Sequence, residues 1–88
     1  MTFSVSDRVR VSAEHHWAGG ATATICLPPP SVISFASGWT GLIRTVDSLR
    51  GPLEFYWVRF DEPQRDADGD GPYQEAEIEA DALEGRPK

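Results

Sequence analysis

Cysteine is almost absent from this chain of 88 residues, which contains only Cys26. A single thiol excludes a disulfide within the chain and a zinc site built from several thiolates. The first residues show no basic stretch followed by an apolar segment, as a signal peptide would. No apolar run approaches the roughly 20 residues that cross a membrane as a helix. We therefore expect a cytoplasmic domain with no membrane partner.

Basic residues are also few, since eight Lys and Arg stand against fourteen Asp and Glu, and the formal net charge is −6. The acidic excess lies in the C-terminal third of the chain. Residues 1–60 hold five basic and four acidic residues, whereas residues 61–88 hold three basic and ten acidic residues. Because proteins bind nucleic acid mainly by placing Lys and Arg on phosphates, this balance argues against a nucleic-acid partner.

Catalytic motifs are lacking as well. The sequence has no nucleophile elbow, no phosphate-binding glycine loop that ends in lysine, and no Ser-His-Asp spacing. Cys26 falls within a predicted strand without a neighbouring base, which is typical of a partly buried thiol rather than a nucleophile. His15 and His16 are adjacent, so in an extended segment they point apart and do not converge on one metal. We expect no enzymatic activity.

Hydrophobic and polar residues alternate with a period of two along most of the chain, which is the pattern of β-strands. The pattern predicts five strands, at residues 3–11, 21–27, 41–46, 53–60 and 74–78. Residues 48–52 predict a hairpin turn between the third and fourth strands. Residues 79–83 predict a single helical turn.

The segments between these strands are rich in residues that interrupt a β-ladder, and the predicted loops cover residues 13–20, 28–38 and 63–72. Three consecutive prolines, 28 to 30, open the second loop as an extended segment, either a stiff connector or a docking ligand. A chain of this size holds one core. We therefore expect one all-β domain over residues 1–84, a small five-stranded barrel with a short helical turn near its C-terminus, followed by a tail at residues 85–88.

Three short motifs resemble SH3-like small barrels. Residues 6–11 (SDRVRV) resemble their opening turn and first strand, and residues 55–60 (FYWVRF) resemble their fourth strand. Residues 76–78 and 82–84 resemble their closing strand and turn, and Ser6 stands where the pattern has glycine. The resemblance is to the electron-transport accessory type, which includes the ferredoxin–thioredoxin reductase variable chain and the C-terminal domain of nitrile hydratase β subunits. It implies an SH3-like barrel with an accessory or scaffold role and no catalytic residue.

Residues 66–77 (DADGDGPYQEAE) fit the calcium-loop pattern D-x-[DN]-x-[DN]-G-x5-E. Because Ca²⁺ prefers six to eight oxygen ligands, the pattern predicts a site formed by Asp66, Asp68, Asp70, the backbone carbonyl of Pro72, and Glu77. A calcium loop of this type follows a helix, whereas Glu62 and Pro63 precede this one. Aspartate and glycine are also common in any exposed turn. Calcium binding and a solvated acidic turn both remain open.

The fourth predicted strand has aromatic residues on both faces. Tyr56, Val58 and Phe60 share one face, and the other carries Phe55, Trp57 and Arg59. One face must fill the core. The face of Phe55 and Trp57 is then either a contact surface for a partner or is covered by the proline-rich loop. That loop carries Val32, Ile33 and Phe35. The predicted partner-binding residues are Phe55, Trp57, Arg59, Trp39, His16 and Trp17.

These observations predict a non-enzymatic protein-interaction or accessory module whose partner is another protein or a peptide. The alternative is a Ca²⁺-binding domain that uses the loop at residues 66–77. No cofactor is expected beyond the Ca²⁺ of that alternative.

Overall fold

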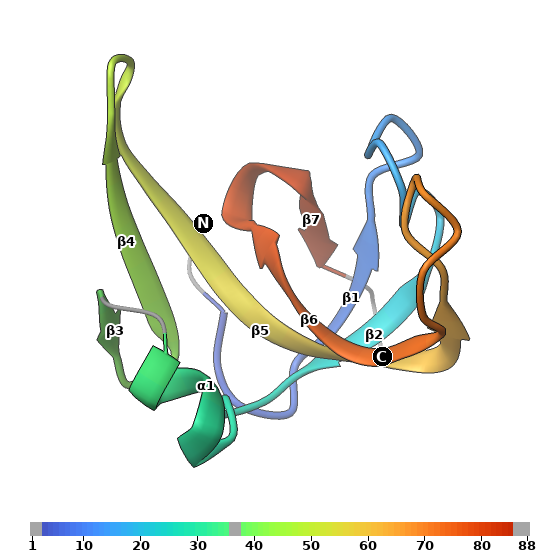
Figure 1. The fold of residues 1–88 in the computed structure, drawn as a ribbon, viewed down its shortest axis with the longest axis horizontal. Helices are drawn as coiled ribbons and strands as arrows, with labels where there is room; N and C mark the ends of the chain where they lie inside the picture. Colours follow the sequence, from blue (N-terminus) through green and yellow to red (C-terminus); the bar gives the residue numbers. More distant parts are fainter. Residues whose placement is uncertain (1–2, 36–37, 86–88) are drawn as a thin grey trace.

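The computed structural model describes residues 3–35 and 38–85 (Figure 1). Its elements in chain order are β1 (Arg8–Val11), β2 (Thr22–Ile25), α1 (Pro30–Phe35), β3 (Trp39–Thr40), β4 (Ile43–Ser48), β5 (Gly51–Gln64), β6 (Tyr73–Glu79), the 3-10 turn η1 (Ala80–Ala82) and β7 (Leu83–Gly85). The all-β class and the helical turn near the C-terminus are confirmed. The described residues form seven strands rather than five, because β3 and β7 are too short to show a period of two.

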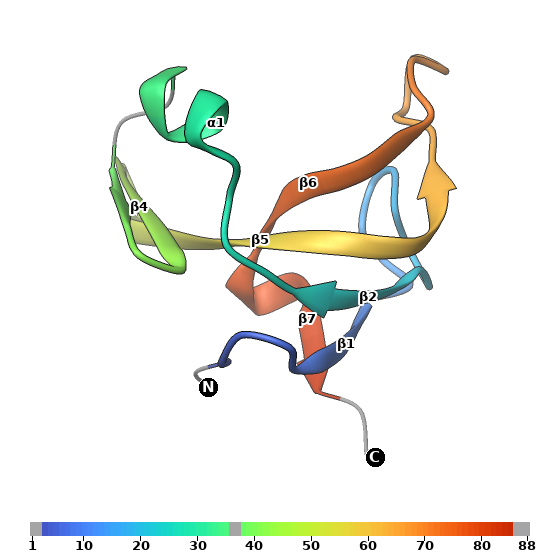
Figure 2. The ribbon, with the colours of Figure 1, turned by 90° about the horizontal axis from the view of Figure 1, so that it is seen from below.

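The proline-rich loop contains a helix, α1, where the sequence predicted an extended segment. The Pro29 carbonyl accepts hydrogen bonds from the amides of Val32 (3.0 Å) and Ile33 (3.2 Å), which starts the helix. Pro30 occupies the first helical position, where its missing N–H leaves no helical hydrogen bond unmade. Both ribbon views place α1 beside β3 and β4 (Figures 1 and 2).

The long strand β5 organises the sheet, whose order is β3-β4-β5-β2-β1-β7 with β6 also paired to β5. The first half of β5 pairs with β4 through the predicted hairpin, and residues 58–60 pair with β2. Residues 55–59 pair with β6 as well. Because a strand has only two edges, β4 and β2 share one edge of β5 and β6 takes the other.

The sheet closes on itself through the last elements of the chain. β6 leads directly into η1 and then into β7, which pairs with β1 through Val11 and Leu83. The strands β5, β2, β1 and β7 are therefore joined into a ring by η1 and β6, and Figure 2 shows the resulting curvature. β7 includes Gly85, one residue beyond the predicted end of the domain, and residues 86–88 lie outside the description.

The ring encloses one hydrophobic core. The inward-facing residues of β5 are buried as the alternation predicted, with Tyr56, Val58 and Phe60 at most 2% exposed. Val9, Val11, Ala23, Ile25, Ile78 and Leu83 complete the core from the other strands. The phenol oxygen of Tyr56 accepts a hydrogen bond from the Phe3 amide at 3.1 Å, which anchors the N-terminal segment to the core.

The first strand begins at Arg8, five residues later than the alternation predicted. A turn occupies the preceding residues, because the amide of Asp7 donates to the carbonyl of Ser4 (3.0 Å) and the Ser4 amide donates to the Asp7 carboxylate (2.8 Å). Ser6 has a φ of 74°, a left-handed conformation that glycine adopts more readily. Ser6 is the position where the SH3-like pattern has glycine.

Candidate functional site

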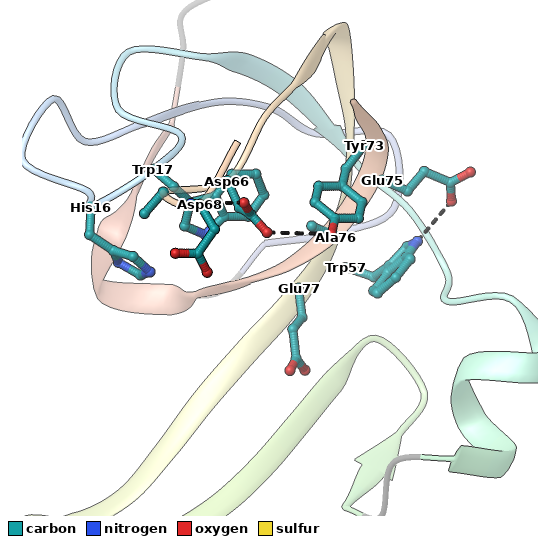
Figure 3. Close-up of a pocket in the computed structure, with 10 residues that line it drawn as sticks. His16, Trp17, Trp57, Asp66, Asp68, Tyr73, Glu75, Ala76 and Glu77 are labelled. Carbon is teal, nitrogen blue, oxygen red and sulfur yellow. Dashed lines mark hydrogen bonds between the residues drawn. The ribbon is translucent and has the colours of Figure 1, made fainter. Parts of the chain in front are cut away.

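A groove of 570 Å³ lies beside β6 (Figure 3). Three aromatic residues and four acidic residues account for most of its lining: Trp17, Trp57, Tyr73, Asp66, Asp68, Glu75 and Glu77. His16, Ala67 and Ala76 complete the lining. The groove therefore combines flat apolar surfaces with a concentration of negative charge.

Trp57 lies on the outer face of β5, opposite the core face of Tyr56 and Val58. Its indole Nε1 donates a hydrogen bond to Glu75 Oε1 at 2.8 Å, and Glu75 belongs to the neighbouring strand β6. The Trp39 ring packs edge-on against Trp57 with 6.3 Å between centroids. These two contacts hold the half-buried indole at the groove.

Trp17 enters the groove from the loop between β1 and β2. Its ring packs edge-on against the core residue Phe60 (centroids 5.8 Å apart) and against Tyr73 (6.1 Å). The loop is held by His15, whose Nδ1 accepts hydrogen bonds from the amides of Trp17 (3.4 Å) and Ala18 (3.1 Å). Trp17 therefore connects the core to the groove.

An ion pair crosses the outer face of the sheet at the same place. Arg44 of β4 donates through Nη1 to both carboxylate oxygens of Glu77, at 2.7 and 2.8 Å. Both side chains are partly buried, with 22% and 36% of their surfaces exposed. The pair spans β5, so it fixes the carboxylate of Glu77 relative to Trp57.

Three of the predicted calcium ligands lie together. Ligand atoms of Asp66, Asp68 and Asp70 are all within 4.8 Å of one another. Asp66 Oδ1 also accepts hydrogen bonds from the amides of Asp68 (3.0 Å) and Asp70 (2.9 Å), so this carboxylate closes the turn. Tyr73 donates to Asp66 Oδ2 at 3.4 Å, and the charge of Asp66 raises the pKa of that phenol.

Of the other two predicted ligands, Glu77 lies apart from this cluster. Pro72 is exposed. Glu77 is bound to Arg44, and Figure 3 shows its carboxylate pointing away from Asp66 and Asp68. Among the described residues, the acidic cluster therefore contains the three aspartates without Glu77.

The predicted partner-binding residues fall into two groups. Trp57, Trp17 and His16 line the groove. Phe55, Arg59 and Trp39 do not line it. Phe55 is half-buried, Arg59 is exposed, and Trp39 packs edge-on against Trp57.

The proline-rich loop and the outer face of β5 are both only partly shielded from solvent. Ile33 is 51% exposed and Val32 is half-buried, while the side chain of Phe35 lies outside the described residues. Phe55 and Trp57 are likewise half-buried. The face is thus neither fully open nor fully covered.

Sequence reasoning missed Tyr73 and Glu75 as site residues. Both lie within the calcium pattern, where they occupy unspecified positions. The available signal was an aromatic residue inside an acidic run, followed by glutamates at every second position of a strand.

The basic residues of β1 are neutralised within the chain. Arg8 donates to Asp61 and to Thr24, and Arg10 pairs with Glu84.

The thiol of Cys26 is half-buried, and burial together with Glu75 raises its pKa, so it stays protonated at neutral pH.

His15 predicts a loss of stability on acidification. Burial, and then the neighbouring His16, lower the pKa of His15 below 6.5, although Glu79 opposes the shift. Protonation of Nδ1 would also remove the acceptor for two backbone amides. The contribution of His15 to stability is therefore present above pH 6.5 and is lost as the pH falls below that value towards the lowered pKa.

The measurement is urea unfolding at about pH 7 and about pH 5, with the pKa of His15 followed by NMR. His15→Asn is the matched control, because an amide oxygen still accepts hydrogen bonds but does not titrate. The variant should lose less stability on acidification than the natural protein. Equal losses would contradict the assignment.

No helix of the described residues is long and apolar enough to span a membrane. Comparisons with protein-family models, curated proteins and solved structures gave no match to this chain.

Proposed function

We propose that this domain is a non-enzymatic protein-interaction module of the cytoplasm, and that it binds a protein or peptide in the groove beside β6. The observation that carries the proposal is the joint presence of Trp17, Trp57 and Tyr73 in one open groove. Its volume of 570 Å³ is within the range of about 300–1,000 Å³ found for ligand sites. Tryptophan and tyrosine are the residues that most often anchor protein interfaces.

The chemistry of the groove favours binding over catalysis. Glu75 holds the indole of Trp57, Glu77 holds Arg44, and Asp66 holds the turn, so these carboxylates already have structural partners. The raised pKa of the Cys26 thiol disfavours a thiolate nucleophile. The resemblance to SH3-like accessory barrels is consistent with the same role. The acidic lining disfavours nucleic acid.

Peptides selected for binding to the purified domain test this proposal. A selected peptide titrated into ¹⁵N-labelled protein should shift amide signals of groove residues. Trp57→Leu and Tyr73→Ala should each weaken binding by about tenfold or more, because aromatic anchors dominate such interfaces. Leu49→Ala is the control, since Leu49 is fully exposed in the turn between β4 and β5.

Amide spectra of the variants verify that they are folded. Peptides that bind the two groove variants as tightly as the natural protein would contradict the proposal. A selection that yields no binding peptide would also contradict the proposal.

A second candidate function is Ca²⁺ binding, which the convergence of Asp66, Asp68 and Asp70 favours. These aspartates offer carboxylate oxygens, the ligands that Ca²⁺ prefers. Glu77 would have to leave Arg44 in order to join them. Natural calcium modules have dissociation constants of about a millimolar or lower, so the affinity is measurable by titration.

If the loop binds calcium, Ca²⁺ at about millimolar concentration should shift amide signals of residues 66–71, and Mg²⁺ should not. Asp68→Asn should weaken the response. Glu77→Gln should do so only if Glu77 leaves Arg44 to bind the ion. The absence of saturable shifts in the natural protein would leave an acidic turn closed by Asp66.

A further inference from the structure

One edge of β6 is available for a further strand. Within residues 3–35 and 38–85, the only strand paired with β6 is β5. A strand that is paired on one side presents backbone N–H and C=O groups on the other. The bare edge extends along Tyr73–Glu79.

The groove follows this edge. Three consecutive residues of β6 line it, namely Glu75, Ala76 and Glu77. Consecutive side chains of a strand point to opposite faces, so a groove that touches all three lies along the strand rather than over one face. In Figure 3, the ribbon of β6 passes between Trp17 on one side and Trp57 with Glu77 on the other.

The charge of the edge specifies what would fit. Glu75, Glu77 and Glu79 occupy alternate positions of β6, and Asp66 and Asp68 lie across the groove. Opposite charges on neighbouring strands stabilise their pairing, and like charges oppose it. An incoming strand with Lys or Arg at alternate positions therefore matches β6, whereas an acidic strand is repelled.

The groups in the groove also suit a guanidinium. A carboxylate has about four acceptor positions, so Glu75 and Glu77 retain acceptors beyond those used by Trp57 and Arg44. Arg44 demonstrates the geometry, since one of its nitrogens already lies 2.7 and 2.8 Å from the two oxygens of Glu77. A cation beside these glutamates lies next to the Trp57 indole, the best aromatic partner for a cation.

Glutamates on a bare edge also protect a protein from edge-to-edge aggregation. Protection accounts for the charges of β6. It does not account for Trp17, Trp57 and Tyr73, which gather around the same edge and add apolar surface to it.

We propose that the partner is an extended basic segment of a protein, which pairs as a strand with the bare edge of β6. Its alternate Arg or Lys side chains lie among Glu75, Glu77 and the aspartates of the groove. Backbone hydrogen bonds supply affinity in this mode of recognition, and the side chains supply specificity. The inference rests on the proposed function, because the segment occupies the same groove.

Three blocked synthetic peptides test the inference. In the first, arginine alternates with alanine. The second has the same sequence with every backbone amide N-methylated, which keeps the charge but removes the backbone donors. The third has glutamate in place of arginine. The arginine peptide should shift the amide signals of Tyr73–Glu79 and slow their hydrogen exchange, while the other two bind at least about tenfold more weakly.

Charge variants of the domain locate the interaction. Glu75→Gln combined with Glu77→Gln should weaken binding of the arginine peptide by about fivefold or more. Glutamine still accepts from Trp57 and Arg44, so the wall of the groove is preserved. Glu54→Gln, an exposed site in β5 outside the groove, is the matched control and should leave the affinity within about twofold.

Three results would overturn the inference: no binding of the arginine peptide, equal binding of the N-methylated peptide, or equal binding of the glutamate peptide. If selected neutral peptides still bind in the groove, the interaction module stands and only the basic strand fails. If neither selected nor designed peptides bind, the proposed function fails as well.

Discussion

Replacing Tyr56 by alanine should lower the free energy of unfolding by about 3–5 kcal/mol, the usual loss for a large aromatic residue of a core. Tyr56 is 1% exposed and packs edge-on against Phe3, with ring centroids 5.3 Å apart. The variant also leaves the Phe3 amide without its acceptor. Small domains have total stabilities near the lower end of about 5–15 kcal/mol. A large fraction of the variant molecules should therefore be unfolded at 37 °C.

Tyr56→Phe is the matched control, because it keeps the ring and removes only the hydroxyl. Its expected loss is about 1 kcal/mol, that of one hydrogen bond with a buried donor. Urea unfolding followed by circular dichroism measures both variants. A loss below about 1 kcal/mol for Tyr56→Ala would contradict the position of this ring at the centre of the core.

Replacing Gly38 by alanine should give the second large loss. Gly38 has a φ of +95°, and a Cβ atom there would lie 2.5 Å from the Thr45 carbonyl oxygen. The Thr45 amide donates to the Gly38 carbonyl at 3.1 Å, so the two backbones are held together and cannot separate cheaply. The strained backbone costs about 1–3 kcal/mol, and the clash adds a similar amount.

Gly51→Ala separates these two contributions. Gly51 has a φ of +103°, but a Cβ atom at this position would meet nothing within 4 Å. Both variants therefore carry backbone strain, and only Gly38→Ala carries the clash. The free energy of unfolding of Gly38→Ala should be lower than that of Gly51→Ala by about 1 kcal/mol or more. Equal stabilities would mean that Gly38 and Thr45 do not approach each other so closely in solution.

Gly38→Ala should also disturb the groove, because Thr45 follows Arg44 in β4. A shift of β4 moves the guanidinium that binds Glu77. Chemical shifts of Glu77 and Trp57 in the variant report this effect, and Gly51→Ala should leave them unchanged.

Local sequence patterns were sufficient to predict which face of β5 fills the core. The alternation over residues 53–60 identified Tyr56, Val58 and Phe60, and all three are buried. The hairpin at residues 48–52 was equally local, since a turn between two alternating runs brings them into register. A strand that is buried on one face shows a period of two in its sequence, so its buried face can be recognised without knowing the partner strands.

The elements that were missed are short or depend on distant contacts. β7 has three residues, and it forms a strand because η1 carries it to β1, where Leu83 pairs with Val11. β3 has two residues and exists through its pairing with β4. A run this short contains too little alternation to be distinguished from a loop.

The sequence by itself determined the all-β class, the core face of β5 and the acidic character of the C-terminal third. Only the tertiary structure decided which side chains meet at the groove. Glu77 fits a calcium ligand in the sequence, yet the register of β4, β5 and β6 places it against Arg44, 33 residues away. Trp17 and Tyr73 meet because a loop and a strand distant in sequence border the same edge of the sheet. Local periodicity fixes the face of a strand on which a residue lies, whereas strand register and sheet curvature fix its neighbours on that face.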